Sequence, residues 1–366
     1  MKRWFVAMSL LLAACNQSSA AAHVSPSASA ASTDGAGSTP IASTSPTQLP
    51  TVNFSCRLPV VTSIPGSTGI NFQGGFIQFP AARLTDDPGG TMLAHSNDVE
   101  TAAAPVLAGD GVDPFYDRAQ SRWVPTQAGQ SLADGSQYAH VTFDSTTGIF
   151  TVHVTTVATG SSRSFRVTVS ELTFPQVADF GPAGVYMYNQ SGLGGPGEGL
   201  WLLDPQTGAM RQVRAIPRLW MVRNGYAWVA RLDPRDKTVW TGSELAPANS
   251  LVRIDLATGS EIEWYYQAGH YPWLQGLDSS GRPLVTLGAS DGNEIRLIDQ
   301  PGSSGRVVYR GNIPGLGYVQ GDRDRLWFGT YDGIYLYTPS QGFARVFAWP
   351  GDSSNSKRIE PAGLCI

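Results

Sequence analysis

One phrase is repeated in this sequence: Gly199-Leu-Trp-Leu-Leu-Asp-Pro-Gln-Thr-Gly208-Ala-Met-Arg-Gln-Val213, and again Ser250-Leu-Val-Arg-Ile-Asp-Leu-Ala-Thr-Gly259-Ser-Glu-Ile-Glu-Trp264. Each copy has an apolar run, an Asp, a short turn that contains Gly, and a second run of mixed polarity. Short β-rich runs bounded by such turns are typical of β-hairpins. The phrase therefore predicts a hairpin that recurs along the chain.

Weaker copies extend the repeat over most of the chain, and they are Phe115–Trp123, Val152–Gly160, Glu294–Asp299 and Gly333–Thr338. The Asp or Thr that ends the first run then stands at positions 117, 156, 204, 255, 299 and 338, at intervals that average about 44 residues. This is the length of a four-stranded propeller blade. We therefore predict an all-β fold, a β-propeller of about six four-stranded blades. The roughly 316 residues after residue 50 would also accommodate seven.

A second phrase precedes the strong copies, as Leu232–Trp240, Leu277–Val285 and Gly321–Trp327. Its Asp and Gly residues suit tight turns, because Asp bonds its own backbone two residues on and Gly accepts positive φ. We predict hairpins between the first and second strands of a blade, opened by Asp233, Asp278 and Asp322. A ring of these carboxylates around cations is the alternative, but turn chemistry already explains them.

The stretch Asp324–Tyr337 resembles the repeat of the propellers found in bacterial sensor ectodomains and in streptogramin-lyase-like proteins. The Asp and Gly hairpins resemble those of TolB-like propellers. The resemblance covers residues 70–350 at the level of the superfamily. It implies a propeller, but propellers include binding proteins, scaffolds and enzymes alike.

The N-terminus has the pattern of a secretory signal. Lys2 and Arg3 precede the apolar run Trp4–Ala13, which is too short to remain a membrane span. The segment ends in Leu12-Ala13-Ala14-Cys15, which resembles the lipobox of bacterial lipoproteins and implies that Cys15 is acylated. An ordinary signal peptide with an incidental cysteine is the alternative. Two or three acyl chains would anchor the protein stably at a membrane.

Residues 16–50 are dominated by Ser, Ala, Thr and Pro, and Asp34 is the only charged residue among them. Such a stretch cannot bury enough apolar surface to offset its ordering entropy. We predict a signal peptide over residues 1–14, a lipidated cysteine and disordered linker over 15–50, and a propeller over 51–366. The protein is then exported and lipid-anchored to the bacterial cell envelope, facing the periplasm or the exterior.

If Cys15 is lipidated, Cys56 and Cys365 remain, one at each end of the β-rich part. An exported protein offers an oxidising compartment and an even cysteine count. A propeller brings its chain ends together when its first and last blades meet. We therefore predict a disulfide between Cys56 and Cys365, and we expect Phe54–Val61 to pair as a strand with the last blade. Two isolated thiols are the alternative.

Composition and motifs narrow the functions. The 25 Lys and Arg residues against 29 Asp and Glu give a net charge of −4, which excludes a basic nucleic-acid footprint. No nucleophile elbow, zinc spacing, phosphate loop or calcium loop is present, so we predict no cofactor and no metal site. His140 and His153 alternate with apolar residues, and we interpret them as strand partners rather than metal ligands.

The loops after the second and fourth strands of each blade share one face, and aromatic and Arg side chains there are the residue types of binding hot spots. Our candidate binding residues are Arg218, Trp220, Arg223, His270, Tyr271 and Trp273. The same face is expected to hold Glu244, Asp291, Tyr318, Tyr331 and Asp332.

Two functions remain open. We favour a non-catalytic, membrane-anchored module that displays a propeller to a protein or a glycan. The alternative is a propeller enzyme of the streptogramin-lyase-like kind, with His270 as the base beside Glu244 or Asp291. A catalytic base must lie within about 3 Å, or one water, of its partner in an open cleft.

Overall fold

The fold was analysed in a computed structural model of the chain. It describes residues 52–366 except 66–69, 94–105, 108–112, 128, 145, 171, 173, 190–198, 217, 236–247, 290–291, 312–315, 318 and 350–357. The predictions for Cys15 and for residues 1–50 therefore lie outside the described residues. Residues 48–366 form one compact unit.

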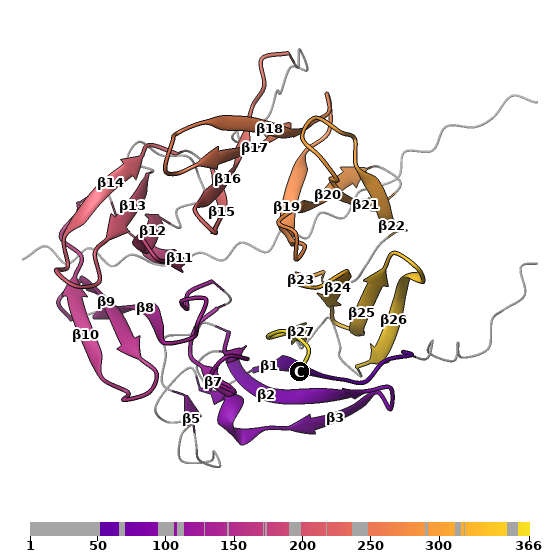
Figure 1. Ribbon diagram of the computed structural model, residues 1–366, viewed down its shortest axis with the longest axis horizontal. Helices are drawn as coiled ribbons and strands as arrows, with labels where there is room; N and C mark the ends of the chain where they lie inside the picture. Colours follow the sequence, from indigo (N-terminus) through magenta and orange to yellow (C-terminus); the bar gives the residue numbers. More distant parts are fainter. Residues whose placement is uncertain are drawn as a thin grey trace, which may run out of the picture. The chain divides into compact units, whose positions relative to one another are not determined.

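Six sheets form the blades of a β-propeller and follow one another in chain order around a centre (Figure 1), which confirms the predicted all-β fold. Their strands pair antiparallel, except for the parallel pair of β4 and β5. We number the blades in that order. Blade 1 contains β27 (Ile359–Pro361), β1 (Cys56–Pro65), β2 (Ile70–Phe79) and β3 (Arg83–Asp86), with the short β4 (Thr91–Met92) and β5 (Val106–Leu107) at its margin. Blade 2 contains β8 (Gln137–Asp144), β9 (Ile149–Thr156) and β10 (Ser162–Arg166).

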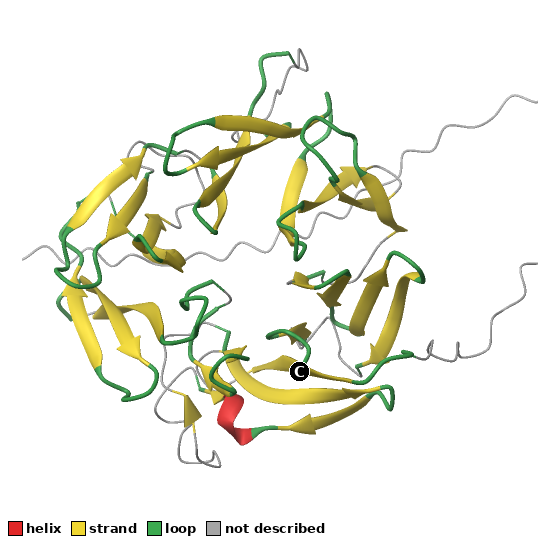
Figure 2. Cartoon of the chain, in the orientation of Figure 1, coloured by secondary structure: helices red, strands yellow, loops and turns green. Residues whose placement is uncertain are grey.

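Blades 3 to 6 each have four strands in sequential order. Their strands are β11 (Pro175–Gly181), β12 (Gly184–Asn189), β13 (Leu200–Leu203), β14 (Met210–Arg214); β15 (Leu219–Arg223), β16 (Tyr226–Arg231), β17 (Ser250–Asp255), β18 (Glu261–Tyr266); β19 (Pro272–Leu277), β20 (Pro283–Ala289), β21 (Gly292–Leu297), β22 (Arg306–Gly311); and β23 (Val319–Asp322), β24 (Arg325–Gly329), β25 (Gly333–Thr338), β26 (Gly342–Ala348). The only helix among the described residues is the short η1 (Pro88–Gly90) (Figure 2).

Five of the six predicted repeat positions end the third strand of a blade or follow it directly. Thr156, Asp255 and Thr338 are the last residues of β9, β17 and β25, while Asp204 and Asp299 come just after β13 and β21. The prediction at Asp117 was wrong. It belongs to a separate two-stranded hairpin, β6 (Phe115–Asp117) and β7 (Arg122–Val124), which shares the strand-and-turn pattern without being a blade.

The predicted Asp turns are correct in blades 5 and 6. Asp278 follows β19 and accepts hydrogen bonds from the amides of Ser280 and Arg282 at 2.9 and 2.8 Å, and Asp322 ends β23. In blade 4 the prediction was wrong. Asp233 lies after the second strand, and the turn between the first two strands is formed by Asn224 and Gly225, both at positive φ. Both Asn224-Gly225 and the phrase at Asp233 are typical of turns. The sequence alone does not show which of them joins the first two strands of the blade.

The C-terminus closes the ring by completing blade 1. β27 pairs antiparallel with β1, and Val60 to Thr62 face Pro361 to Ile359. Cys56 and Cys365 form the predicted disulfide, with Cα atoms 5.6 Å apart. The predicted strand begins at Cys56 rather than Phe54, and its partner is β27 and not a strand of the last blade, because the chain continues past blade 6 and returns to blade 1.

The hydrophobic core is divided among the seams between blades. One cluster joins each neighbouring pair from blade 2 to blade 6, and another joins blade 6 to blade 1 around Leu58 and Trp327. At the remaining seam the cluster formed by Val61, Phe76, Tyr116, Trp123 and Ala362 joins blade 1 to the β6–β7 hairpin. No residue of β8, β9 or β10 belongs to that cluster. Blade 2 is thus packed against blade 3 on one side and meets a hairpin on the other.

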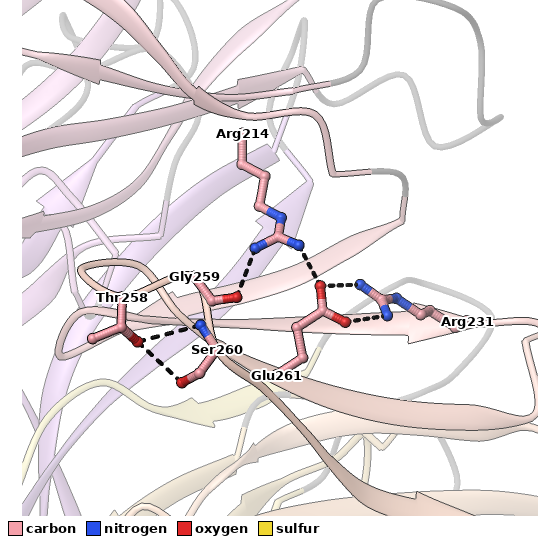
Figure 3. A network of polar contacts seen from close by, with 6 residues as sticks. All are labelled: Arg214, Arg231, Thr258, Gly259, Ser260 and Glu261. Carbon is pink, nitrogen blue, oxygen red and sulfur yellow. Dashed lines mark hydrogen bonds and ion pairs between the residues drawn. The ribbon is translucent and has the colours of Figure 1, made fainter.

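Polar contacts also connect neighbouring blades (Figure 3). Arg214 of β14 and Arg231 of β16 converge on Glu261 of β18, and Arg214 also donates to the Gly259 carbonyl at 3.0 Å. The hydrogen bond from Arg231 is the largest influence that lowers the pKa of Glu261. These side chains are partly exposed, so their contribution to stability is modest.

No helix among the described residues is long and apolar enough to span a membrane.

Candidate functional site

The candidate site lies on the face formed by the connections after the second and fourth strands. Two of these connections, 190–199 and 232–249, are longer than any turn on the opposite side, whereas others, such as 290–291, are short. We call this side the loop-rich face. In blades 3 to 6 the first strand begins there, and in each blade the second strand ends there.

Two tryptophans pair on this face. Trp220 lies in a β-bulge of β15, between Leu219 and Met221, and bulges redirect side chains out of the regular ladder. Trp273, near the start of β19, is 59% exposed, and the two ring centroids are 4.4 Å apart at an interplanar angle of 59°. The indole Nε1 of Trp220 is buried and has no hydrogen-bond partner in the described part of the chain. The sequence-predicted pair Trp220 and Trp273 is therefore in contact.

His270 and Tyr271 directly precede β19, beside Trp273, and both are half-buried. The Nδ1 atom of His270 is buried and makes no hydrogen bond to a described residue. Its proposed catalytic partners Glu244 and Asp291, as well as Tyr318, lie outside the described residues. Asp332 accepts hydrogen bonds from Thr330, Tyr335 and Arg345 within blade 6.

The two candidate arginines lie at opposite ends of β15. Arg218 precedes the strand on the loop-rich face, with φ of 57°, and its carbonyl accepts a hydrogen bond from Ala230 at 3.1 Å. Arg223 ends the strand, so its backbone is not on the loop-rich face as we had expected. The reason is topological, because the first strand of a blade runs away from that face. Its side chain still lines the same cavity as Trp220.

Two adjoining cavities form a cleft from blade 4 to blade 2. The smaller, about 110 Å³, is lined by Tyr188, Trp220 and Arg223 among others. The larger, about 290 Å³, is lined by the β8 residues 140–143, by Phe150 of β9 and by the start of β11. The two cavities share four lining residues, which are Gln127, Gln130, Gln176 and Val177. We call the two cavities together the cleft.

Carboxamides line the middle of the cleft. Gln130 is buried and donates to the Val177 carbonyl at 3.0 Å, while its Oε1 accepts the Gln127 amide at 3.0 Å. Tyr188 donates to Gln176 at 3.1 Å. The carboxamide of Gln127 is not hydrogen-bonded to any described residue, although Gln127 also lines a third, smaller cavity next to Glu360. Gln127 therefore presents a donor and an acceptor to the space where the cavities meet.

A buried carboxyl lies beside Arg223, which lines the smaller cavity. Asp179 of β11 is 5% exposed, and its Oδ1 lies 3.9 Å from a guanidinium nitrogen of Arg223. Burial raises the pKa of Asp179 to about 6, against the opposing effect of Arg223. Asp113, at the third cavity, also has a raised pKa because of burial, opposed by Arg358 and by a hydrogen bond with Glu360. Among the described residues no three His, Cys, Asp or Glu side chains converge as metal ligands.

Aromatic side chains continue the loop-rich face across blade 2. Phe143 and Phe150 contact each other with centroids 4.5 Å apart, and Phe174 packs against Phe150 at 6.2 Å. Phe143 is 52% exposed and Phe174 61%. His140 and His153, interpreted from the sequence as strand partners, face each other across β8 and β9 with stacked rings.

The sequence prediction found the tryptophans but not the cleft. Gln127 and Gln130 lie between the β6–β7 hairpin and β8, in a segment with no repeat phrase. Phe143 and Phe150 flank a turn of blade 2, and their alternating pattern is equally typical of a core-facing strand. The one signal in the sequence for the pair Phe143 and Phe150 was an aromatic residue on each side of a turn.

Comparison with solved structures finds propellers. The chain is similar to TolB from Acinetobacter baumannii, with 13% identity over 84% of this chain and 65% of that one, and a TM-score of 0.42. It is similar to the propeller domain of the trilobed protease from Pyrococcus furiosus, with 13% identity, coverage of 84% and 85%, and a TM-score of 0.38. It is also similar to virginiamycin B lyase from Staphylococcus aureus, with 12% identity, coverage of 83% and 94%, and a TM-score of 0.36.

The propeller fold of this chain is shown by its own six blades. The chain spans about two thirds of the length of the TolB chain, 65%. No protein-family model and no curated protein matches the sequence.

Proposed function

We propose that this protein is a lipid-anchored, extracytoplasmic binding module whose propeller holds a partner, a protein or a glycan, at the loop-rich face. The lipobox-like residues Leu12 to Cys15 behind a short apolar run support the anchor. The disulfide between Cys56 and Cys365 supports an oxidising compartment outside the cytoplasm. The stretch of 36 residues from Cys15 to Pro50 is long enough to let the propeller stand away from the membrane.

The distribution of exposed apolar side chains carries the binding role. Four of these side chains, Phe143, Phe174, Leu232 and Trp273, lie at strand ends on the loop-rich face. The full set of exposed large apolar side chains among the described residues also includes Ile262, Val307 and Ile366. Exposed apolar groups gathered beside a polar cleft are typical of interaction sites.

Binding fits the cleft better than catalysis does. Its central polar groups are the carboxamides of Gln127, Gln130 and Gln176, which form hydrogen bonds without titrating near neutral pH. A lyase-like enzyme would need a base with a charged or polar partner. The buried Nδ1 of His270 has no such partner among the described residues.

The anchor is tested by Cys15→Ser. Without a site for acyl chains, the protein is expected to move from the membrane pellet to the soluble fraction. Cys56→Ser is the matched control and should stay in the pellet, because it removes a cysteine without touching the anchor. A Cys15→Ser protein that still sediments with membranes would show that another element holds it.

The binding face is tested by the double variant Trp220→Ala and Trp273→Ala. Crosslinking in the native envelope should yield a partner with the unchanged protein and not with this variant. The matched control is Ile262→Ala with Val307→Ala, which removes exposed apolar side chains from the opposite face. Equal crosslinking by both variants would contradict the proposed face. A severe loss of melting temperature in the tryptophan variant alone would assign these residues to the core.

A further inference from the structure

Blade 2 has only a fragment of its innermost strand. In blades 3 to 6 the strands β11, β15, β19 and β23 pair along the second strand. In blade 2 the corresponding segment is Gln130 to Leu132, where Ala139 donates to the Gln130 carbonyl at 2.8 Å and Leu132 donates to the Gln137 carbonyl at 2.9 Å.

A turn lies at the N-terminal end of this fragment. The Gln130 amide bonds back to the Gln127 carbonyl at 3.1 Å, and Gly129 has φ of 96°, so the preceding chain departs from β8.

Beyond Ala139, the inner edge of β8 receives no backbone hydrogen bond from a described residue. Backbone groups alternate between the two edges of a strand, and the amide of Ala139 points to the inner edge. The amides of Val141 and Phe143 therefore point the same way, and neither bonds to a described residue there. Natural edge strands are usually blocked by proline, lysine or a bulge, and residues 140–143 have none of these.

This part of the β8 edge lines the larger cavity of the cleft. His140, Val141, Thr142 and Phe143 form one wall, and Pro175 to Val177 of β11 form another. No Asp, Glu, Lys or Arg side chain lines this cavity. Because β8 ends at the loop-rich face, an extended chain can reach this edge from that face.

Blade 1 demonstrates what can occupy such a position. Its innermost strand, β27, comes from the far end of the chain and pairs over only three residues, opposite Val60 to Thr62. Further backbone hydrogen bonds, such as that from Ala362 to the Pro59 carbonyl at 2.9 Å, extend the contact on both sides of this ladder. A segment from a distant part of the chain therefore serves as the innermost strand of a blade in this protein.

We propose that an extended segment of a partner protein adds to β8 as the innermost strand of blade 2, antiparallel to residues 141–143. This proposal rests on the proposed function as a binding module, and it names the partner as a protein that contributes a β-strand. Strand addition to an exposed sheet edge is a general mode of peptide recognition, in which backbone hydrogen bonds supply affinity and alternate side chains supply specificity.

The position fixes the side-chain pattern of the partner. Residues opposite Val141 and Phe143 share their face, which is the apolar face of blade 2 with Val152 and Phe150. These partner residues should be apolar, and their amides point toward β8. The intervening residues face Thr142 and His140 and should be polar and uncharged, because the cavity lining carries no acidic, Lys or Arg side chain.

The test uses the acetylated and amidated pentapeptide Ser-Ile-Thr-Ile-Ser and the full chain. Titration should shift the backbone amide resonances of Val141 and Phe143 and slow their hydrogen exchange. N-methylation of the two Ile residues removes the amides that face β8 and should weaken binding at least tenfold. N-methylation of Thr removes an amide that points away and should change affinity less than twofold. Equal effects of the two modifications would overturn the proposal.

Protein variants supply a second readout. Val141→Pro removes an inner-edge donor together with the Val141 side chain and should weaken peptide binding at least tenfold, whereas Ile262→Ala should leave binding unchanged. If Val141→Pro fails to fold, the pair of methylated peptides decides alone. If an uncharged glucose hexamer shifts the Val141 and Phe143 amide resonances to saturation while the peptide has no effect, the cleft binds a glycan. That result would overturn strand addition.

The two proposals fail separately. If no peptide binds β8 while Trp220→Ala with Trp273→Ala still abolishes partner crosslinking, strand addition is wrong and the binding face stands. If the peptide binds β8 while the tryptophan variant crosslinks normally, the proposed face is wrong and the β8 site stands.

Discussion

Blades 1 and 2 differ in how far the inner edge of β1 or β8 is hydrogen-bonded. In both, the innermost strand is short, but the edge of β1 is covered along its length by the C-terminal segment. Arg57 and Ile366 exchange two backbone hydrogen bonds at 3.0 and 3.1 Å, and Ser63 donates to the Arg358 carbonyl at 3.1 Å. On β8 the corresponding coverage ends at Ala139. Among the described residues, the inner edge of blade 1 is thus bonded along its length, whereas that of blade 2 is bonded only up to Ala139.

The difference shows that closing a ring and filling every blade are separate requirements. Joining the chain ends needs a strand from the C-terminus in blade 1, and the disulfide reinforces that join. Blade 2 contributes to the ring by packing on blade 3, through Ala139, Val152 and Val154 against Val177 and Val185. Its inner edge takes no part in this packing, and the amides of Val141 and Phe143 bond to no described residue there.

Removing the segment bonded to the edge of β1 should have the largest effect. A chain ending at residue 357 lacks β27, the buried Ile359 and Ala362, and the disulfide. We expect it to lose cooperative thermal unfolding, because blade 1 then has no innermost strand and the ring has no join. Calorimetry measures this. A truncated protein that melts cooperatively within a few degrees of the full chain would contradict the assigned closure.

The disulfide alone should matter less. Cys56→Ser with Cys365→Ser keeps the β1–β27 ladder, so the protein should fold and lose about 2–4 kcal/mol of stability. Denaturant unfolding of the variant against the oxidised protein gives the value. Peptide mapping without reductant must recover the linked peptides from the unchanged protein, and two free thiols would remove this part of the account.

Matched prolines compare the two edges directly. Ser63→Pro deletes a donor that bonds to the Arg358 carbonyl, whereas Val141→Pro deletes a donor without a described partner. Ser63→Pro should therefore lose more stability for its deleted amide, by about 1–3 kcal/mol. Urea unfolding measures both free energies. Equal losses would mean that the inner edge of β8 is as fully bonded as that of β1.

The smallest effect concerns the buried carboxyl beside Arg223. The pKa of Asp179 is raised to about 6, so the folded protein holds its proton more tightly than the unfolded chain. This stabilisation is complete below about pH 4 and is lost as pH rises through 6.

Asp179→Asn should therefore be more stable than the unchanged protein at pH 7.5, by about 1–3 kcal/mol. The difference should vanish near pH 4. Melting curves across this range measure it, and a variant that is less stable at pH 7.5 would mean that the ion pair with Arg223 outweighs burial.

The sequence was most informative where the repeat is regular. The phrases around Asp204 and Asp255 predicted β13–β14 and β17–β18, and the cysteine positions predicted the closing disulfide. Turn assignment was less reliable, because Asp233 and the pair Asn224 and Gly225 both carry turn chemistry within ten residues of one another.

The cleft depends on structure that no local pattern encodes. Trp220 and Trp273 could be predicted to share one face, and each lies near the start of the first strand of its blade. Gln127 reaches the cleft only because the chain turns at Gly129 and leaves β8 uncovered. No sequence motif marks a position where a strand is absent. The unbonded part of the β8 edge could therefore be identified only from the strand pairing in the structure.

Residue-resolved hydrogen exchange of the unliganded protein tests the central claim most directly. We predict that the amides of Arg57 and Ser63, which bond to the C-terminal segment, exchange only through global unfolding. The amides of Val141 and Phe143, on the inner edge of β8, should exchange orders of magnitude faster, while Ala139 in the same strand stays protected. Protection of Val141 and Phe143 equal to that of Arg57 and Ser63 would contradict the account, because the inner edge of blade 2 would then be closed.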